Sequence, residues 1–146
     1  MKILITGSSG LLGLNLALEL SQVHAVTGAD RNPLTGQEAF KALPVELLEP
    51  DAIPTLLDRV APDALIHCAA MANVDACESD PEMADRLNAE LPGRIAAQAA
   101  KRGIQLVHVS TDSVFDGQTG GYTESDPTNP LSVYACTKLD GERRVL

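Results

Sequence analysis

The segment KILITGSSGLLGLNLALELSQ, residues 2–22, decides the fold of this chain. Its beginning, KILIT, is a short run of apolar and β-branched residues, which is typical of a buried strand. Its end, LLGLNLALELSQ, carries apolar residues at helical spacing. Between the two, TGSSGLLG places Gly7, Gly10 and Gly13 at the turn from strand to helix. This order of strand, glycine-rich turn and helix indicates the first unit of a parallel α/β sheet.

The rest of the chain continues the alternation of strands and helices. Four further strands are expected at residues 24–30, 45–49, 64–70 and 104–109. A helix is expected at residues 50–62, and a short helical turn at residues 80–88 with Asp80 as its N-cap. A longer helix should follow and end at Gly103. The last helix should begin after Ser132, its N-cap, and run to the end of the chain. Residues 115–130 are rich in turn formers and predict a surface loop.

This alternation predicts an α/β fold, a Rossmann-type doubly wound parallel sheet with strand order 3-2-1-4-5. In such sheets ligands bind at the carboxyl ends of the strands, where the strand order reverses. We therefore expect the chemistry in the loops after the first, fourth and fifth strands.

Composition excludes several classes of partner. The 146 residues carry a formal net charge of -9, which argues against nucleic acid because phosphates attract basic surfaces. No apolar run approaches the roughly 20 residues that span a bilayer, so we expect no membrane partner. MKILITG lacks the apolar region of a signal peptide, so we expect an intact N-terminus and a cytoplasmic location. Cys68, Cys77 and Cys136 lack metal-ligand spacing, which predicts reduced thiols and no metal site.

The glycine-rich turn has the features of a dinucleotide site. Gly7 permits the tight turn, Gly10 lets a pyrophosphate approach the first helical amides, and Gly13 allows close packing of helix and strand. Asp30 ends the second expected strand, near the offset of roughly 20 residues at which a carboxylate binds the adenosine ribose. That carboxylate repels a 2′-phosphate and favours NAD(H), whereas Arg31 can pair with the phosphate and leaves NADP(H) open.

Two residues of the terminal helix suit proton transfer. Tyr134 and Lys138 are four positions apart and project from one helical face. A free tyrosine has a pKa of about 10, and a nearby ammonium lowers such a pKa by stabilising the phenolate. Thr111 follows the fifth expected strand, so its hydroxyl faces the same cleft as the glycine-rich turn. The three side chains suit reversible hydride transfer at a carbonyl, whose oxygen Thr111 would orient.

Taken together, these motifs resemble the extended short-chain dehydrogenases/reductases. The broad signature is TGSSGLLG (6–13), YACTK (134–138) and Asn88 in RLNAE, at the position of the family's structural asparagine. Within that superfamily the chain is most similar to the dTDP-4-dehydrorhamnose reductases, whose pattern is STDYVFDG followed by YxExDxxxPxxxYGxSKxxGE. The corresponding stretches here are STDSVFDG (110–117) and YTESDPTNPLSVYACTKLDGE (122–142). Residues 69–88 also resemble the loop that follows the fourth strand in that family.

The resemblance implies roles for individual residues. The implied catalytic residues are Thr111, Tyr134 as proton donor, and Lys138, which would also hold the nicotinamide ribose. Besides Tyr134 and Lys138, the implied cofactor contacts are Gly7, Ser9, Gly10, Leu11, Leu12, Asp30, Arg31, Glu46, Leu47, Ala69 and Ala70. The implied substrate contacts are Val74, Thr111, Asp112 and Ser113.

The implied activity is NAD(P)-dependent reduction of a nucleotide-linked 4-keto-6-deoxysugar. Ser113 and Met71 replace a tyrosine and an aromatic residue of the family pattern, so the identity of the sugar stays open. One alternative is a sugar-nucleotide epimerase or dehydratase of the same superfamily. Another is a non-catalytic regulatory subunit similar to the beta subunit of methionine adenosyltransferase.

Family members are much longer than this chain and contain later strands and a C-terminal domain that binds the substrate. We therefore expect residues 1–146 to be the NAD(P)-binding Rossmann domain of a longer protein, inactive by itself. For the oligomeric state of the full-length protein, we consider a homodimer.

Overall fold

The computed structural model describes residues 1–34, 36 and 38–146, which form two compact units. The first unit comprises Met1–Ala70 and Arg94–Val109 and contains the whole sheet. The second unit comprises Met71–Gly93 and Ser110–Leu146 and is largely helical.

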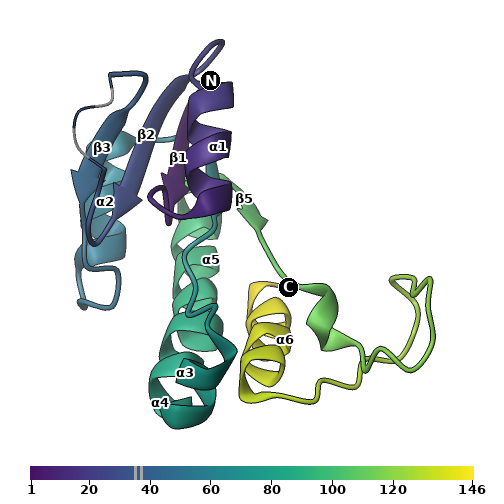
Figure 1. Ribbon diagram of the computed structural model, residues 1–146. Helices are drawn as coiled ribbons and strands as arrows, with labels where there is room; N and C mark the ends of the chain where they lie inside the picture. Colours follow the sequence, from purple (N-terminus) through teal and green to yellow (C-terminus); the bar gives the residue numbers. More distant parts are fainter. Residues whose placement is uncertain (35, 37) are drawn as a thin grey trace. The chain divides into compact units, whose positions relative to one another are not determined.

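The sheet of the first unit has five parallel strands in the order β3-β2-β1-β4-β5, so the predicted Rossmann-type fold and strand order are confirmed. Helix α1 (Leu11–Leu20) lies in front of the sheet and α2 (Ala52–Val60) behind it, as Figure 1 shows. The sheet is therefore covered on both faces, as in doubly wound folds. The strands are β1 (Lys2–Thr6), β2 (Ala25–Asp30), β3 (Lys41–Pro44), β4 (Ala64–His67) and β5 (Gln105–His108).

Strand β1 lies at the centre of the first unit's core. Ile3 and Ile5 pack in one buried cluster with Ala17 of α1, Val26 of β2 and Phe40. The intervening residue of β1 is fully buried as well, so the strand is covered on both faces. Burial of one such aliphatic side chain contributes roughly 1.5–3 kcal/mol. This core fixes the end of β1, from which the glycine-rich turn leaves.

The third strand lies at Lys41–Pro44, and the prediction of a strand at residues 45–49 is wrong. The Val45 N–H donates to the Asp30 carbonyl at 2.9 Å, one residue after the last paired position, and the chain then turns. Pro44 is tolerated because β3 lies at the sheet edge, where one side of the strand needs no partner. Leu47 after this strand is buried in a turn, and periodicity alone does not distinguish such a turn from a short strand.

The first helix of the second unit is α3 (Val74–Ser79), and after it the chain is helical from Pro81 to Arg102. A short helical turn and a separate longer helix were expected there, but α4 (Pro81–Asp85), η1 (Arg86–Glu90) and α5 (Leu91–Arg102) follow without a break. The η1 segment is a π-type turn whose Leu91 N–H donates to the Arg86 carbonyl, five residues back. Pro92 follows directly and cannot donate a hydrogen bond, so the wider turn accommodates it within the helical stretch.

Three predicted helix-end residues, Asp80, Ser132 and Gly103, are confirmed. Asp80 accepts the Met83 N–H at 3.0 Å at the start of α4. Ser132 accepts the Ala135 N–H at 3.2 Å at the start of α6 (Val133–Val145). Gly103 ends α5 with a φ of 66°, a left-handed conformation that favours glycine.

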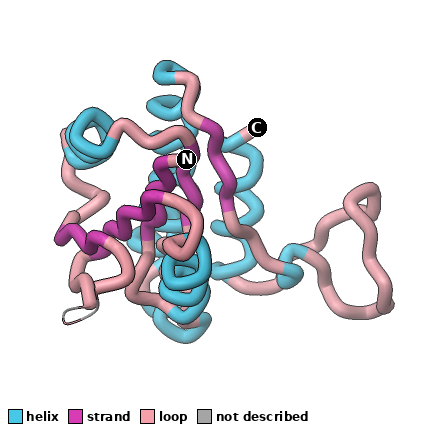
Figure 2. The backbone as a smooth tube through the Cα atoms, turned by 90° about the horizontal axis from the view of Figure 1, so that it is seen from above, coloured by secondary structure: helices cyan, strands magenta, loops and turns pink. Residues whose placement is uncertain are grey.

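The predicted loop at residues 115–130 is also confirmed. It follows the short 3-10 helix η2 (Asp112–Val114) and contains no helix or strand. Figure 2 shows it as a long loop that leaves and returns close to η2. The Asn129 N–H donates to the Val114 carbonyl at 2.9 Å and closes the loop at its base.

Candidate functional site

The glycine-rich turn connects β1 to α1 in a conformation that requires glycine. Gly7 has a φ of 74°, and its N–H donates to the Ala29 carbonyl at 2.9 Å. A Cβ added at Gly7 would lie 2.6 Å from the Ala69 backbone nitrogen, at the beginning of the loop after β4. A Cβ at Gly13 would overlap the Gly7 carbonyl. The turn thus packs against backbone on two sides, which explains two of the three glycines.

The N-terminus of α1 is open to a ligand. Gly10 is the N-cap in an extended conformation, and no side chain caps this helix within the described part of the chain. Among the described residues, a Cβ at Gly10 would meet only the Gly7 carbonyl, at 3.4 Å. Leu11 and Leu12, the first helical residues, are 87% and 47% exposed. The first backbone N–H groups of this ten-residue helix can therefore donate to an anionic group such as a pyrophosphate. The residues around them leave room for such a group.

Asp30 lies beside this turn at the end of β2. One carboxylate oxygen accepts the Ser9 N–H at 3.1 Å and the other accepts the Asn32 N–H at 3.2 Å. The Ser9 hydroxyl donates to the Asn32 carbonyl at 2.9 Å. Asp30 therefore braces the glycine-rich turn, a role that the sequence did not predict. A carboxylate has about four lone-pair sites, so Asp30 keeps the capacity to accept a ribose hydroxyl. Arg31 beside it is exposed.

The other predicted cofactor residues of the first unit follow the neighbouring strands. Glu46 is exposed just after β3 and accepts the Leu48 N–H at 3.3 Å, whereas Leu47 is buried. Ala69 is half-buried and Ala70 exposed after β4. The structure thus brings the predicted cofactor residues of this unit to the carboxyl ends of its strands.

The predicted catalytic pair lies on α6 in the second unit. Tyr134 and Lys138 are one helical turn apart; the tyrosine is half-buried and the lysine only 3% exposed. Thr111 precedes η2, and its hydroxyl oxygen accepts the Ser113 N–H at 3.2 Å. Val74, a predicted substrate contact, begins α3 and is 45% exposed.

A buried amide holds the segment that carries the pair. Asn88, 1% exposed, accepts the Met71 N–H at 2.8 Å and donates to the Met71 carbonyl at 3.1 Å. Its amide also donates to the Thr137 hydroxyl at 3.2 Å, and that hydroxyl donates to the Tyr134 carbonyl at 3.0 Å. A continuous set of hydrogen bonds therefore connects the loop after β4, η1 and α6 within the second unit.

Cys77 is part of the same buried region. Its thiol donates to the Met71 carbonyl at 3.2 Å. Burial raises the pKa of Cys77, the charge of Glu78 raises it further, and the hydrogen bond with Asn88 acts in the opposite direction. Because the thiolate is the reactive form, this cysteine is structural in character.

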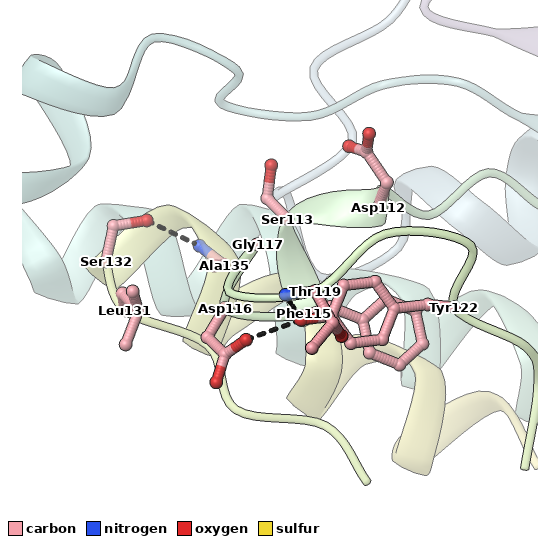
Figure 3. A pocket seen from close by; sticks show the side chains of 10 residues that line it. All are labelled: Asp112, Ser113, Phe115, Asp116, Gly117, Thr119, Tyr122, Leu131, Ser132 and Ala135. Carbon is pink, nitrogen blue, oxygen red and sulfur yellow. Dashed lines mark hydrogen bonds between the residues drawn. The ribbon is translucent and has the colours of Figure 1, made fainter. Parts of the chain in front are cut away.

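A pocket of about 630 Å³ opens in the second unit. Two predicted substrate residues, Asp112 and Ser113, line it, and Figure 3 shows their side chains at its upper rim. The remaining lining residues, which sequence reasoning missed, come from the loop and the start of α6: Phe115, Asp116, Gly117, Thr119, Tyr122, Leu131, Ser132 and Ala135. Thr111 and Tyr134 are not among the lining residues.

Asp116 organises the wall of this pocket. Its carboxylate accepts hydrogen bonds from the Tyr122 hydroxyl at 2.6 Å, the Asn129 amide at 3.0 Å and the Gln118 N–H at 3.0 Å. The Asn129 amide, followed by the Tyr122 hydroxyl and the Gln118 N–H, lowers the pKa of Asp116 to about 2. Phe115 stacks on Tyr122 with ring centroids 4.6 Å apart. The sequence signal for this arrangement is an aspartate before a glycine, followed by a tyrosine and an asparagine in one turn-rich loop.

Residues 1–34, 36 and 38–146 contain neither a cluster of metal-ligating side chains nor a membrane-spanning helix. No three His, Cys, Asp or Glu side chains are grouped there as a metal ion would require. No helix in these ranges is both long enough and apolar enough to cross a membrane.

Known proteins are similar to this chain over nearly its whole length. The family model described as RmlD substrate binding domain matches residues 1–146. Methionine adenosyltransferase 2 subunit beta of Rattus norvegicus is 40% identical over 99% of this chain and 42% of its own length. A dTDP-4-dehydrorhamnose reductase of Burkholderia thailandensis is 38% identical over 99% of this chain and 45% of its own length. The chain thus spans less than half the length of these curated relatives.

Solved structures share the fold. A hypothetical dTDP-4-dehydrorhamnose reductase from Sulfolobus tokodaii superposes with a TM-score of 0.90 and 36% identity, over 100% of this chain and 52% of that one. The Bacillus anthracis dTDP-4-dehydrorhamnose reductase in complex with NADP has a TM-score of 0.85 and 29% identity, over 99% and 48% of the two chains. MoeE5 in complex with UDP-glucose and NAD has a TM-score of 0.87 and 27% identity, again over 99% and 48%.

These matches confirm the predicted similarity to the dTDP-4-dehydrorhamnose reductases, on a fold that the structure shows independently. The chain therefore belongs to the RmlD substrate binding domain family.

Proposed function

We propose that the protein containing this chain is an NAD(P)-dependent reductase of a nucleotide-linked 4-keto-6-deoxysugar. The observation that carries the proposal is the burial of Lys138, 3% exposed, one helical turn from Tyr134. A lysine is almost never buried without a specific partner or task, and burial strengthens the effect of its charge on groups nearby. The match to named reductases supports the same reading.

The residues of the first unit fit a nicotinamide dinucleotide. The uncapped N-terminus of α1 would hold the pyrophosphate through its first amides, and Asp30 would accept a hydroxyl of the adenosine ribose. Glu46, Leu47, Ala69 and Ala70 would flank the adenine and the rest of the dinucleotide. Solved relatives that hold NADP or NAD support a cofactor of this class.

In the proposed reaction a bound nicotinamide supplies a hydride to the carbonyl carbon of the sugar. Tyr134 gives its hydroxyl proton to the carbonyl oxygen as that oxygen gains negative charge, and it later regains a proton from water. The Lys138 ammonium stabilises the intervening phenolate, because an opposite charge favours the ionised form. Thr111 donates a hydrogen bond to the same oxygen and orients the carbonyl. Val74, Asp112 and Ser113 would contact the sugar.

For the cofactor we propose a preference for NAD(H) over NADP(H). The Asp30 carboxylate is held in place by two backbone N–H groups, so it cannot easily turn away from a 2′-phosphate. Titration of the full-length protein with NADH and NADPH tests this preference. Asp30→Asn should narrow the difference between the two dissociation constants, and tighter binding of NADPH by the unaltered protein would contradict it.

Replacement of Tyr134 by phenylalanine tests the reaction itself. In the full-length protein Tyr134→Phe should reduce turnover by at least about 100-fold, because general acid catalysis contributes about 10²–10⁴-fold. Cofactor affinity should change little. Cys136→Ser is the matched control, because Cys136 is an exposed residue of the same helix. Retention of turnover by Tyr134→Phe would contradict the proposal.

Two other functions have specific support. Identity of 40% to a methionine adenosyltransferase subunit favours a non-catalytic regulatory subunit, which would bind cofactor and copurify with a partner enzyme without reducing any keto-sugar. The structural match to a UDP-glucuronic acid 4-epimerase from Bacillus cereus in complex with NAD, at 25% identity and a TM-score of 0.84, favours a sugar-nucleotide epimerase or dehydratase. Such an enzyme would be purified with stoichiometric NAD, whereas a reductase requires added NAD(P)H.

We also propose that residues 1–146 supply the cofactor-binding domain and that substrate reduction needs more of the protein. This proposal predicts that the isolated 146-residue chain lacks turnover. Assay of that chain beside the full-length protein, at equal concentration and with saturating NADH or NADPH, checks it. Full reductase activity of the isolated chain would contradict it.

A further inference from the structure

The proposed proton donor occupies a weak place in its helix. Tyr134 is the second residue of α6, which begins at Val133. The first N–H groups of a helix have no partner within the helix, and helix ends fray when nothing else binds these groups. The position of the tyrosine therefore depends on what holds the first turn of α6.

The backbone N–H groups of the two residues next to Tyr134, Val133 and Ala135, are held by side chains. The Glu78 carboxylate accepts the Val133 N–H at 2.8 Å, across 55 positions of sequence. The Ser132 hydroxyl accepts the Ala135 N–H at 3.2 Å, an interaction drawn in Figure 3. The first residue and the third residue of the helix are thus both fixed, and the tyrosine lies between them.

Glu78 is itself presented by an anchored helix. Asn73 caps α3 by accepting the Ala76 N–H at 2.8 Å. Cys77, next to Glu78, is fully buried and donates to the Met71 carbonyl. The Glu78 side chain is exposed, but its backbone belongs to this fixed segment. A carboxylate at the N-terminus of α6 also interacts favourably with the helix dipole, and an ionised acceptor makes a stronger hydrogen bond than a neutral one.

From this geometry we infer that Glu78 is a positioning residue for Tyr134: by accepting the Val133 N–H it fixes the first turn of α6 and the direction of the tyrosine side chain. The inference rests on the proposed function, in which Tyr134 donates a proton. It goes beyond that function by assigning a task to a carboxylate that is neither a cofactor contact nor a substrate contact. Loss of the hydrogen bond should therefore affect the chemical step and leave cofactor binding intact.

Three variants of the full-length protein test the inference. Glu78→Ala removes the acceptor, Glu78→Gln keeps a neutral oxygen acceptor, and Glu90→Ala removes an equal charge from an exposed position of η1 in the same unit. In Glu78→Ala the amide hydrogen exchange of Val133 should become about 5- to 30-fold faster, the range that corresponds to loss of a helix cap. The kcat should fall by about 5- to 100-fold, since small misplacements of a reacting group have effects of this size.

The conservative and control variants make the outcome specific. Glu78→Gln should recover most of the exchange protection and of the kcat, whereas Glu90→Ala should match the unaltered protein in both. The KM for the cofactor should stay within about 2-fold in all three, as expected when only a transition-state interaction is affected. An unchanged kcat in Glu78→Ala would overturn the inference, and so would an equal loss in Glu78→Gln, because charge alone would then explain the effect.

Failure of the inference can be told apart from failure of the proposed function. If Tyr134→Phe abolishes turnover and Glu78→Ala does not change it, only the positioning role is wrong. If Tyr134→Phe keeps full turnover, the proposed function is wrong, and the Val133 exchange rate then reports only whether Glu78 holds the helix.

Discussion

Asn88 donates its side-chain amide to the Thr137 hydroxyl at 3.2 Å, and both residues are buried, at 1% and 7% exposure. The same amide group exchanges two hydrogen bonds with the backbone of Met71. Each polar atom of the buried Asn88 side chain thus has a hydrogen-bond partner. Such a network makes a segment rigid when it is complete and costs stability when one member is lost.

Replacement of Asn88 should therefore destabilise the protein. Asn88→Leu keeps the approximate volume of the side chain. It leaves the Met71 N–H without its side-chain partner, and the Met71 carbonyl keeps only the hydrogen bond from the Cys77 thiol. Each buried group left unpaired costs about 1–3 kcal/mol. We expect the free energy of unfolding to fall by at least that amount, measured by urea denaturation.

Two variants of Thr137 provide the control. Thr137→Val keeps the shape and removes the hydroxyl, so it should cost about 1–3 kcal/mol because one N–H of the Asn88 amide loses its acceptor. Thr137→Ser keeps the hydroxyl and loses one methyl group, at a cost of about 0.8 kcal/mol. A free energy of unfolding that is the same for Asn88→Leu and the unaltered protein would contradict the importance of the network.

The glycine-rich turn should tolerate substitution less than another turn of similar conformation. Gly7 and Gly103 have φ angles of 74° and 66°, but a Cβ at Gly7 would lie 2.6 Å from backbone, whereas nothing in the described part of the chain lies within 4 Å of one at Gly103. Gly103→Ala should cost only the strain of a left-handed residue, at the lower end of about 1–3 kcal/mol. Gly7→Ala adds a backbone overlap and should cost clearly more. Thermal unfolding of the two variants in parallel measures the difference, and equal costs would contradict it.

Much of the first unit could be predicted because local signals and global fold agree there. KILIT and the glycines after it specify a buried strand, a left-handed turn and a helix within a few residues of each other. The caps at Asp80 and Ser132 were predictable because a side-chain oxygen at a helix start needs only local geometry.

The missed features depend on contacts between distant residues. β3 was misplaced because its position is set by pairing with β2, not by its own apolar pattern. A separate helix was expected after residue 88, whereas the structure continues through a π-type turn into one longer helical stretch that includes Pro92. The wall of the pocket depends on the hydrogen bond from the Asn129 amide to the Asp116 carboxylate across the loop. Sequence spacing in an irregular loop does not predict such a contact, because loop residues lack a fixed period.

Asp116 should stay ionised to unusually low pH. Its pKa of about 2 in the folded protein lies below the ordinary value for an aspartate, about 3.9. Its contribution to stability is therefore fully present above about pH 4 and is lost as pH falls through about 2. A titration of the Asp116 carboxyl carbon by NMR should show a midpoint near 2.

Two variants of the loop separate the causes of this low pKa. Asn129→Ala removes the largest contribution, so the midpoint of the Asp116 titration should rise. Gln118→Ala keeps the backbone N–H that bonds to Asp116 and should leave the midpoint unchanged. An Asp116 midpoint near 4 in the unaltered protein would show that the loop is not organised around this carboxylate.

The three thiols should react in an order set by their surroundings. Cys136 is exposed on α6, Cys68 is half-buried, and Cys77 is fully buried with a raised pKa. At pH 7.5, a value chosen near neutrality, alkylation followed by peptide mapping should modify Cys136 first and Cys77 only after denaturation, because the thiolate is the nucleophile. Glu78→Gln removes one of the two causes that raise the Cys77 pKa but leaves its burial, so Cys77 should stay protected in that variant. Equal labelling of Cys77 and Cys136 in the folded protein would mean that α3 opens readily, and a helix that opens readily cannot hold the first turn of α6.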